Sequence, residues 1–550
     1  MREEDQERIL TEVQSRVVQG VCDVSEHGGA PLDEVVADSI YHEMRRLKDA
    51  KDSKQKREDH VFYSGVRQRM QRASHETHAD LVRQVAKRYS EEISGNFDER
   101  IYQAVTKAGA PAMGMLLNAV SPKRLMRRFP ELPTVDEAIV VQGEVEQLRR
   151  LHEKGTVILV PTHTSNLDSI IIGFALYKLG LPPFIYGAGL NLFDNPLVGF
   201  FMHNLGAYTV DRNKRDPLYK KVLKEYATLT LEHDYDNIFF PGGTRARSGA
   251  IEKKLKLGLL GTGLKAYINN SRRNKPGSNI YIVPATLSFQ LVLEAETLID
   301  DFLKEVGKAR YIITDDEFSK PKKVLDFFQQ LFSLDSKIYF TIGRAFDPFG
   351  NEVDDEGNSL DPMGRVFDTR FNVMRNGEFV HDNQRDNEYT RHLGTKLSEA
   401  YLKDNVVQAT HVTAHAMLNE LRKQDPRSDL VRLLRSGGTH EDVDLRTLYV
   451  EVDRLLNELR GLQARGGIRL GPVVSKAPAD EVVQDAIRHF GSYHSEAAIT
   501  RRGDRVFPTS RSLIFYYSNR LEGYRMHREG GIGPALTPCH QKLGTERRRS

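Results

Sequence analysis

Between about residues 110 and 350, short strand-like runs alternate with helical stretches, and this alternation most constrains the fold. Four runs rich in β-branched and aromatic residues indicate strands, at 157–161, before 241 (ending in Phe239-Phe240-Pro241), at 280–284 and at 338–342. The segments between them include apolar stretches that we interpret as helices, at 167–179 and 255–268. Strands separated by helices predict an α/β fold in which helices cover a central sheet.

Helical patterns flank this α/β region on both sides. Valines 13 and 17 repeat at helical spacing near the start, and Ala414, Met417 and Leu421 do so near the other end. The segment 350–364 is rich in Asp, Asn, Gly and Pro; we interpret its acids as turn residues rather than calcium ligands, and we expect no internal repeat. The predicted organisation is an N-terminal helical region (1–105), an α/β domain (106–365), a C-terminal helical region (366–529) and a disordered tail (530–550).

Charge and cysteine content narrow the classes of partner. The 550 residues include 79 basic and 76 acidic residues, a net charge of only +3, so the molecule as a whole attracts no single class of charged partner. No nucleic-acid-binding motif is recognisable, and we expect no nucleic-acid partner. Cys22 and Cys539 fit neither a disulfide framework nor a metal site, which favours a reducing compartment. We expect no secretory signal and, without a run of about 18 apolar residues, only peripheral membrane contact.

The first candidate for chemistry is the pair His163 and Asp168, directly after the strand at 157–161. If both residues were helical, their side chains would lie about 140° apart around the axis and could not meet. If His163 lies in a loop and a helix starts near Ser165, Asp168 sits in the first turn and faces back. The aspartate then orients the imidazole, which can activate a hydroxyl as a general base. The alternative is a helix cap from Ser165 to Asp168 beside an ordinary loop histidine.

The second candidate is a set of arginines at the ends of strand-like segments. Arg212 ends the segment 206–212, and the Gly-rich stretch 242–245, Gly-Gly-Thr-Arg, follows the strand before 241. Glycines let backbone N–H groups approach an anion, and arginine binds phosphate through two hydrogen bonds. Nine basic residues lie between 245 and 275 against one acid, Glu252. The alternative for part of this stretch is a solvated basic helix face.

Together these motifs resemble the glycerophospholipid acyltransferase superfamily, and most closely its glycerol-3-phosphate acyltransferase branch. The matching motifs, in order along roughly residues 110–350, are His163 to Asp168, 206–212, 240–245 and 282–284. The resemblance implies a mixed central sheet (the acyltransferase fold), with His163 as general base and Asp168 orienting it. It also implies a substrate-binding role for Arg212, Gly243, Thr244, Arg245, Arg247 and Pro284, the last beside the acyl pocket at a strand end.

The resemblance further implies the reaction and its setting. An acyl group would pass from acyl-CoA or an acyl carrier protein to glycerol 3-phosphate in phospholipid biosynthesis, with no cofactor, no metal and no covalent enzyme intermediate. The enzyme would be cytoplasmic and peripheral on the cytoplasmic face of the cell membrane. Lysophosphatidate and dihydroxyacetone phosphate are alternative acceptors. A catalytically weak lipid- or phosphate-binding protein on the same fold is the alternative of another class.

One position departs from the family pattern. The third motif of the family usually carries glutamate where this chain has Gly242, and no neighbouring acid is expected to replace it. We interpret Gly242-Gly243 as a turn built for close backbone approach.

Two apolar stretches, 179–210 and 110–120, are candidates for acyl-chain or membrane contact. Prolines and glycines in the longer one exclude a spanning helix, and the alternative for it is a buried core segment.

Overall fold

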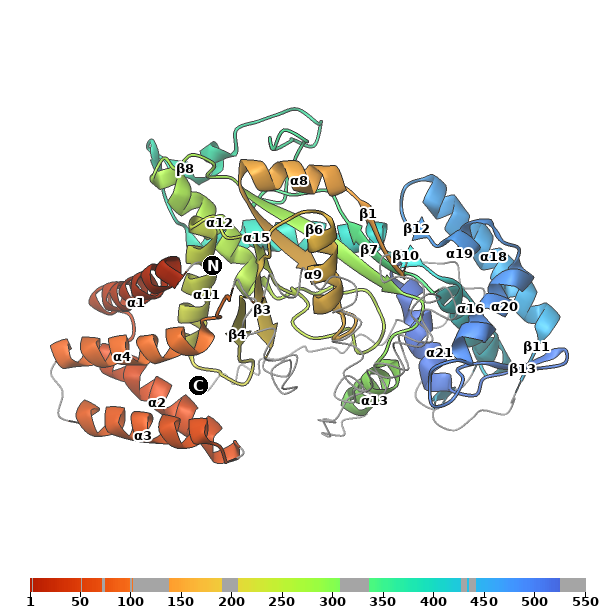
Figure 1. The fold of residues 1–550 in the computed structure, drawn as a ribbon, viewed down its shortest axis with the longest axis horizontal. Helices are drawn as coiled ribbons and strands as arrows, with labels where there is room; N and C mark the ends of the chain where they lie inside the picture. Colours follow the sequence, from red (N-terminus) through yellow and green to blue (C-terminus); the bar gives the residue numbers. More distant parts are fainter. Residues whose placement is uncertain are drawn as a thin grey trace, which may run out of the picture. The chain divides into compact units, whose positions relative to one another are not determined.

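A computed structural model describes most of the chain (Figure 1). The described residues are 1, 3–50, 52–71, 75–98, 101, 138–189, 206–306, 336–426, 433–434 and 442–524. They divide into two compact units. The first comprises Met1–Arg245, Glu252–Phe289 and Pro321–Val406, and the second comprises Ala246–Ile251, Gln290–Lys320 and Val407–Ser550. The N-terminal helices and the sheet fall in one of these units, and the predicted borders at 105, 365 and 529 stay a prediction.

The first unit is built on a seven-stranded sheet in the order β1-β7-β6-β2-β5-β3-β4. Its strands are β1 (Ile139–Gly143), β2 (Thr156–Pro161), β3 (Ile185–Gly189), β4 (Ala207–Val210), β5 (Asn237–Ile238), β6 (Ile280–Phe289) and β7 (Ile338–Ile342). All neighbouring pairs are parallel except β6 and β7. The predicted α/β fold with a mixed sheet is therefore confirmed.

Two of the predicted strands have different bounds. β5 ends at Ile238, so Phe239 and Phe240 already belong to the following turn. β6 continues to Phe289, which places Pro284 inside a strand rather than at its end. The strand tolerates this proline, which has no N–H to donate, and the Pro284 carbonyl accepts a hydrogen bond from the Gly343 N–H at 2.8 Å.

The parallel strands bring the predicted motifs to one edge of the sheet. β2, β5, β3 and β4 run in the same direction and are neighbours in that order. His163 follows β2, the glycine pair follows β5, and Arg212 follows β4. Because the carboxyl ends of parallel strands share an edge, three segments that are distant in sequence meet there.

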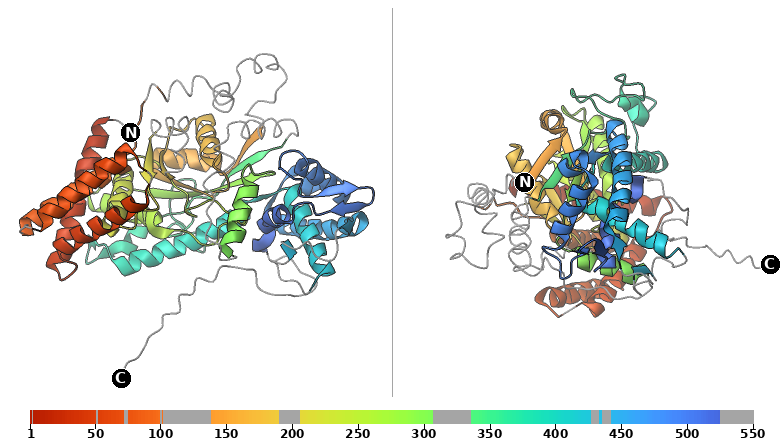
Figure 2. Two further views of the ribbon diagram at one scale, coloured as in Figure 1. Left: turned by 90° about the horizontal axis from the view of Figure 1, so that it is seen from below. Right: turned by 90° about the vertical axis from the view of Figure 1, so that its right-hand side faces the viewer.

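Helices cover both faces of this sheet. Helix α9 (Asp168–Lys178) and helix α15 (Asn383–Asp404) lie on opposite sides of it (Figure 2). Helices α11 (Pro217–Glu232) and α12 (Leu257–Arg272) pack side by side, and α12 also contacts α15 and β6. Helix α8 (Val145–Lys154) precedes β2. The strands β2 and β6 are buried along their whole length, as expected for a sheet covered on both faces.

Four N-terminal helices share a core with α11. They are α1 (Glu3–Glu26), α2 (Leu32–Asp49), α3 (Lys54–Met70) and α4 (His75–Ile93). Val13 and Val17 of α1, which repeat at helical spacing in the sequence, are fully buried, as is Val85 of α4. They belong to one hydrophobic cluster with Tyr219 and Val222 of α11. The N-terminal region is therefore attached to the helix that follows the Arg212 loop.

A seven-residue repeat, which we did not expect from the sequence, follows β7. Asp347, Asp354 and Asp361 each accept two backbone N–H bonds through one oxygen. Each aspartate is followed three residues later by a glycine with positive φ, at 350, 357 and 364. An apolar residue, Phe346, Val353 or Leu360, also precedes each aspartate, so the period is seven residues and matches neither a helix nor a strand. The acids are turn residues, as predicted.

The second unit is mainly helical. Its described helices are α13 (Ala295–Val306), α16 (Ala409–Gln424), α18 (Leu445–Ala464), α19 (Pro472–Lys476), α20 (Ala479–Phe490) and α21 (Arg511–Ser518). The predicted core residues Ala414, Met417 and Leu421 are buried on α16. The predicted tail at 530–550 lies outside the described residues. Among the described helices, none is long and apolar enough to cross a membrane.

Candidate active site

His163 and Asp168 meet at the carboxyl end of β2. His163 lies in the loop between β2 and α9, and Asp168 is the first residue of α9. The His163 Nδ1 atom lies 2.9 Å from the Asp168 Oδ2 atom, and the two residues are 7% and 0% exposed. The loop histidine and the first-turn aspartate are therefore placed as the predicted catalytic arrangement requires.

The same carboxylate also orders the loop. Asp168 Oδ2 accepts hydrogen bonds from the backbone N–H groups of Thr164 at 2.6 Å and Ser165 at 2.9 Å. The Ser165 hydroxyl accepts from the Leu167 N–H rather than from the Asp168 N–H. Of the two hydrogen bonds of a capping box, the one from the Ser165 N–H to the Asp168 carboxylate is present, and the one from the Asp168 N–H to the Ser165 hydroxyl is not. One carboxylate serves both the backbone and the imidazole.

The environment of His163 favours its neutral form. Burial, together with the positive charges of Arg245 and Arg212, holds the pKa of His163 well below its ordinary value. Its ring stacks on the Phe240 ring, with the centroids 4.0 Å apart and the planes at 13°. With Nδ1–H donated to Asp168, the other ring nitrogen, Nε2, is a proton acceptor. The strands that precede His163, Arg245 and Arg212 are parallel and share one edge of the sheet, in agreement with the effect of both arginines on this pKa.

The turn after β5 carries the glycine pair and Arg245. Gly243 has φ +77°, in the left-handed region that favours glycine, whereas Gly242 does not have a positive φ. Gly243 donates its N–H to the Phe240 carbonyl at 3.1 Å. Thr244 is exposed and Arg245 is half-buried. The turn therefore depends on Gly243 for its conformation, as a phosphate-binding loop with close backbone approach would.

Arg212 lies in the loop after β4, and the N-terminal helices hold that loop. Arg212 is exposed, whereas Lys214, two residues later, is 4% exposed. The Lys214 ammonium lies 2.6 Å from a carboxylate oxygen of Glu92 and 3.3 Å from one of Glu43. It also lies 4.7 Å from the centroid of the Tyr89 ring. The segment that presents Arg212 is therefore anchored by a buried cation.

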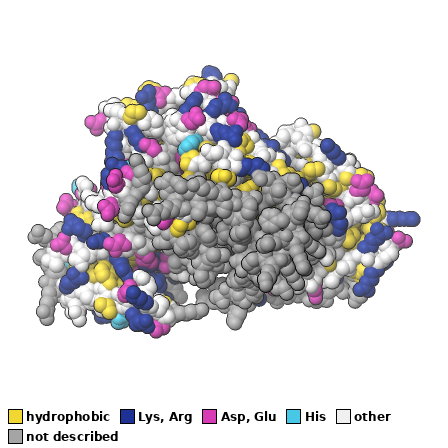
Figure 3. Space-filling view, in the orientation of Figure 1, with side chains coloured by type: hydrophobic (Ala, Val, Ile, Leu, Met, Phe, Trp, Pro, Cys, Tyr) yellow, Lys and Arg dark blue, Asp and Glu magenta, His cyan; other side chains and the backbone are white. Residues whose placement is uncertain are grey.

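The remaining predicted residues lie in other surroundings. Arg247 belongs to the second unit, where its guanidinium pairs with Glu305 at 2.9 Å. Pro284 is buried in β6, in register with Val160 of β2. In the rest of the basic stretch 245–275, three side chains form ion pairs with acids from other segments, namely Lys265, Arg273 and Lys275. Basic and acidic side chains are likewise interspersed on the described surface in Figure 3.

Two residues of the site, Glu252 and Lys214, were assigned no role from the sequence. Glu252 accepts a hydrogen bond from the His163 backbone N–H at 2.8 Å, so a neighbouring acid does reach the glycine turn, contrary to expectation. Lys214 had no sequence signal beyond its place two residues after Arg212. Glu252 stands out in the sequence as the single acid in a basic stretch, but only the fold shows what it contacts.

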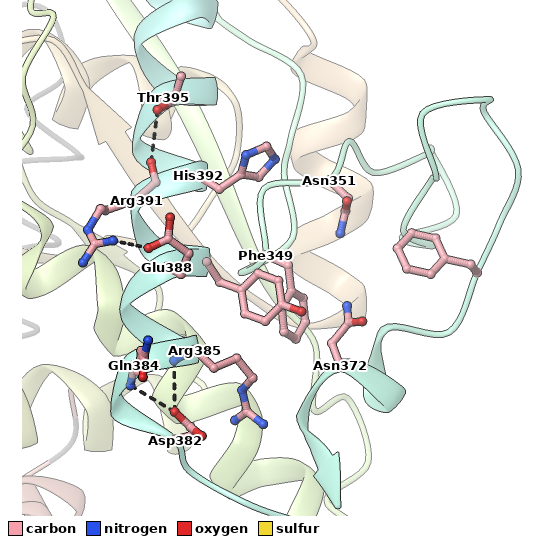
Figure 4. A pocket seen from close by; sticks show the side chains of 12 residues that line it. Phe349, Asn351, Asn372, Asp382, Gln384, Arg385, Glu388, Arg391, His392 and Thr395 are labelled. Atoms are coloured by element: carbon pink, nitrogen blue, oxygen red, sulfur yellow. Dashed lines mark hydrogen bonds and ion pairs between the residues drawn. The ribbon is translucent and has the colours of Figure 1, made fainter.

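A pocket elsewhere in the first unit is separate from these residues. It has a volume of about 1190 Å³ and lies between α15 and the loops from Phe349 to Asn372 (Figure 4). The Phe349 and Tyr389 rings meet there edge to face at 4.9 Å. Its lining includes none of the predicted site residues. Within the described ranges, no group of three or more His, Cys, Asp or Glu side chains is arranged to hold a metal ion.

The predicted apolar contact surfaces are largely outside the described residues. The stretch 110–120 lies wholly outside them, as do residues 190–205 of the stretch 179–210. Of the described part, Leu181, Phe184 and Ile185 are buried. The part before β3 thus belongs to a core, and the acyl-chain role of the rest stays a prediction.

Comparisons with known proteins give a family match for part of the chain. Residues 142–288 match the family model described as Acyltransferase. The glycerol-3-phosphate acyltransferase of Pseudomonas fluorescens (strain SBW25) is 29% identical over 174 residues, and that of Pseudomonas putida (strain W619) is 26% identical over 293 residues. These alignments cover 32% and 53% of this chain, but only 20% and 32% of the relatives. The chain thus spans a fifth to a third of the length of these relatives.

A solved structure is also similar. It is the 1-acyl-sn-glycerophosphate (LPA) acyltransferase PlsC from Thermotoga maritima, which is 17% identical, with a TM-score of 0.23 over 46% of this chain and 86% of that chain. The matched range 142–288 of the family model includes all four motifs quoted from the sequence.

Proposed function

The chain belongs to the glycerophospholipid acyltransferase superfamily through an acyltransferase domain at residues 142–288, and we propose that it transfers an acyl group to the hydroxyl of glycerol 3-phosphate. The acyl donor is acyl-CoA or an acyl carrier protein. The observation that carries the proposal is the buried contact of 2.9 Å between His163 Nδ1 and Asp168 Oδ2. This contact leaves Nε2 as a base at the edge of the sheet where the motifs meet.

In the proposed reaction His163 moves one proton. Its Nε2 takes the proton of the acceptor hydroxyl as the oxygen attacks the thioester carbonyl carbon. The new C–O bond forms, the C–S bond breaks, and the imidazolium returns the proton to the departing thiolate. Asp168 keeps Nε2 pointed at the acceptor and stabilises the transient imidazolium. Because Asp168 is tied to the loop by two backbone N–H groups, little reorganisation is needed during the step.

The acceptor phosphate is assigned to Arg245, Arg212 and the turn around Gly243 and Thr244. The charges of both arginines act on His163, so an anion bound by them lies near the base. Phosphate is the anion for which two arginines and a glycine turn are best suited. The names of the relatives support glycerol 3-phosphate as the acceptor.

The setting of the enzyme is part of the proposal. Long-chain acyl groups and lysophospholipid products partition to bilayers, so we place the protein in the cytoplasm, peripheral on the cytoplasmic face of the cell membrane. The reaction as written needs no cofactor beyond the acyl donor. The pathway served is phospholipid biosynthesis.

Product formation by the purified full chain tests the proposal. The protein is incubated with palmitoyl-CoA and each of three acceptors (glycerol 3-phosphate, dihydroxyacetone phosphate and lysophosphatidate), and both free thiol and lipid product are measured. We expect thiol release that depends on glycerol 3-phosphate and yields lysophosphatidate. Palmitoyl-loaded acyl carrier protein is tested as a second donor. Binding of acyl chains without product from either donor would instead indicate a lipid-binding protein.

A further inference from the structure

The space beside Gly242 is already filled. A Cβ atom built on Gly242 would lie 2.7 Å from Oε1 and 3.0 Å from Cδ of Glu252. These distances are shorter than ordinary contacts, so a side chain at 242 and the Glu252 carboxylate cannot occupy the same place. The backbone at 242, unlike that at Gly243, does not have a positive φ. A side chain at 242 would therefore require the Glu252 side chain to move, whereas the backbone at 242 does not itself call for glycine.

The Glu252 carboxylate joins two loops of the site. Its Oε1 atom accepts the His163 backbone N–H at 2.8 Å on one side and lies against the Gly242 turn on the other. These loops follow β2 and β5, which are neighbouring strands. One carboxylate thus sets the separation between the loop that carries the base and the turn that leads to Arg245.

We propose that Glu252 is a positioning residue for His163, supplying from ten residues away the carboxylate that a side chain at 242 would otherwise place between the two loops. The inference rests on the proposed function for its kinetic consequence. The first motif is tied down from two directions, by Asp168 inside the loop and by Glu252 from outside it. Removing the outside tie lets the loop shift relative to the phosphate-binding turn while the histidine–aspartate contact survives.

The positioning of the His163 loop requires a carboxylate at this place, whichever residue carries it. A contact that only stabilises the fold would not be restored by a carboxylate attached to another residue. A carboxylate attached to residue 242 is one carbon (Asp) or two (Glu) from a Cβ that already lies 2.7 Å from the Glu252 oxygen. Relocating the carboxylate should therefore restore the site when Glu252 is truncated. Adding it while Glu252 is present places two like charges in one space and should lower activity.

The experiment compares Glu252→Ala, Gly242→Glu, and the two relocated variants Gly242→Asp/Glu252→Ala and Gly242→Glu/Glu252→Ala in the full chain. The matched control is Glu356→Ala, which truncates an exposed glutamate of the same unit. Turnover with palmitoyl-CoA and glycerol 3-phosphate is measured together with hydrogen exchange of the His163 amide and the thermal midpoint.

We expect Glu252→Ala to lower kcat roughly 10- to 100-fold, the effect of losing one charge-assisted hydrogen bond, with a smaller change in KM for glycerol 3-phosphate. Its His163 amide should exchange faster, and at least one relocated variant should regain roughly tenfold in kcat and the amide protection. Wild-type kcat in Glu252→Ala would overturn the proposal, as would failure of both relocated variants to recover. If the wild-type protein itself forms no lysophosphatidate, the proposed function fails, and the amide exchange still decides the role of Glu252.

Discussion

The loop after β2 and the loop after β4 both present a functional residue at the same edge of the sheet, but they are held in different ways. The first is ordered from within, since Asp168 bonds the N–H groups of Thr164 and Ser165 and the ring of His163. The second, which carries Arg212, is ordered from far along the chain. Lys214 is anchored by Glu43 and Glu92, and Tyr89 donates a hydrogen bond to Asp216 at 2.6 Å.

The position of the proposed base, His163, is therefore fixed independently of the position of the proposed phosphate ligand, Arg212. A general base must keep its hydrogen bond within a narrow geometry, and bonds to its own loop provide this directly. An exposed arginine that binds phosphate is positioned by the loop beneath it, and here that loop depends on the N-terminal helices. In the proposed mechanism the N-terminal region therefore supports the acceptor side of the site.

The largest effect on the reaction rate should come from removing the His163 side chain while the loop after β2 keeps its structure. His163→Ala removes the base, and loss of a positioned base lowers the rate roughly 10²- to 10⁴-fold. Because Asp168 keeps its two backbone bonds, the thermal midpoint should stay close to that of the wild type. Single-turnover rates and circular dichroism melts measure the two quantities. Wild-type turnover in this variant would refute the mechanism.

Loosening the loop after β4 should instead lower the free energy of unfolding as well as acceptor binding. Lys214→Met leaves Glu43 and Glu92 without their shared cation, which costs about 3 kcal/mol, the low end for a buried pair because the Glu92 side chain is 26% exposed. Urea unfolding and the KM for glycerol 3-phosphate should both change, whereas the KM for palmitoyl-CoA should not. Lys220→Met, on the exposed surface of α11, is the control. If Lys214→Met were as stable as Lys220→Met, the ion pairs of Lys214 with the N-terminal helices would not hold the loop after β4.

The arginines test whether both loops serve one anion. Arg245→Ala and Arg212→Ala should each raise the KM for glycerol 3-phosphate by the equivalent of about 1.5–3 kcal/mol, the usual contribution of a hydrogen bond to a charged group. The KM for the acyl donor should change far less. Steady-state kinetics with each substrate varied in turn provide the measurement. Equal changes for both substrates would reassign the arginines to the donor phosphates or to structure.

The smallest effect concerns the pKa of His163. Burial and the charges of Arg245 and Arg212 lower this pKa, so the ring should remain neutral at pH values below the ordinary histidine pKa of about 6.5. Removing the Arg245 charge should move the pKa upward, and protonation should then begin at a higher pH as the pH falls. Titration of ¹³C-histidine-labelled free protein, with His163→Ala identifying the resonance, measures it. A downward shift in Arg245→Ala would contradict the proximity of the two groups.

Much of this could be predicted because the signals are local. The five-residue spacing of His163 and Asp168 is compatible with contact only when a loop precedes a helix, and α9 begins at Asp168 as that requires. The predicted end of β5 was three residues too late. Phe239 and Phe240 are apolar, like strand residues, but they lie in the turn. The repeat at Asp347, Asp354 and Asp361 was missed because its period matches neither a helix nor a strand.

By itself, the sequence determined the α/β class, the contact between His163 and Asp168, and the arginine-bearing turns, since these depend on periodicity and on contacts between near neighbours. Only the tertiary structure decided that Glu252 fills the space beside Gly242 and that Lys214 is anchored by helices more than a hundred residues earlier. Such contacts carry no sequence period. They arise because parallel strands and packed helices bring distant segments to one edge of the sheet, where buried polar groups must find partners.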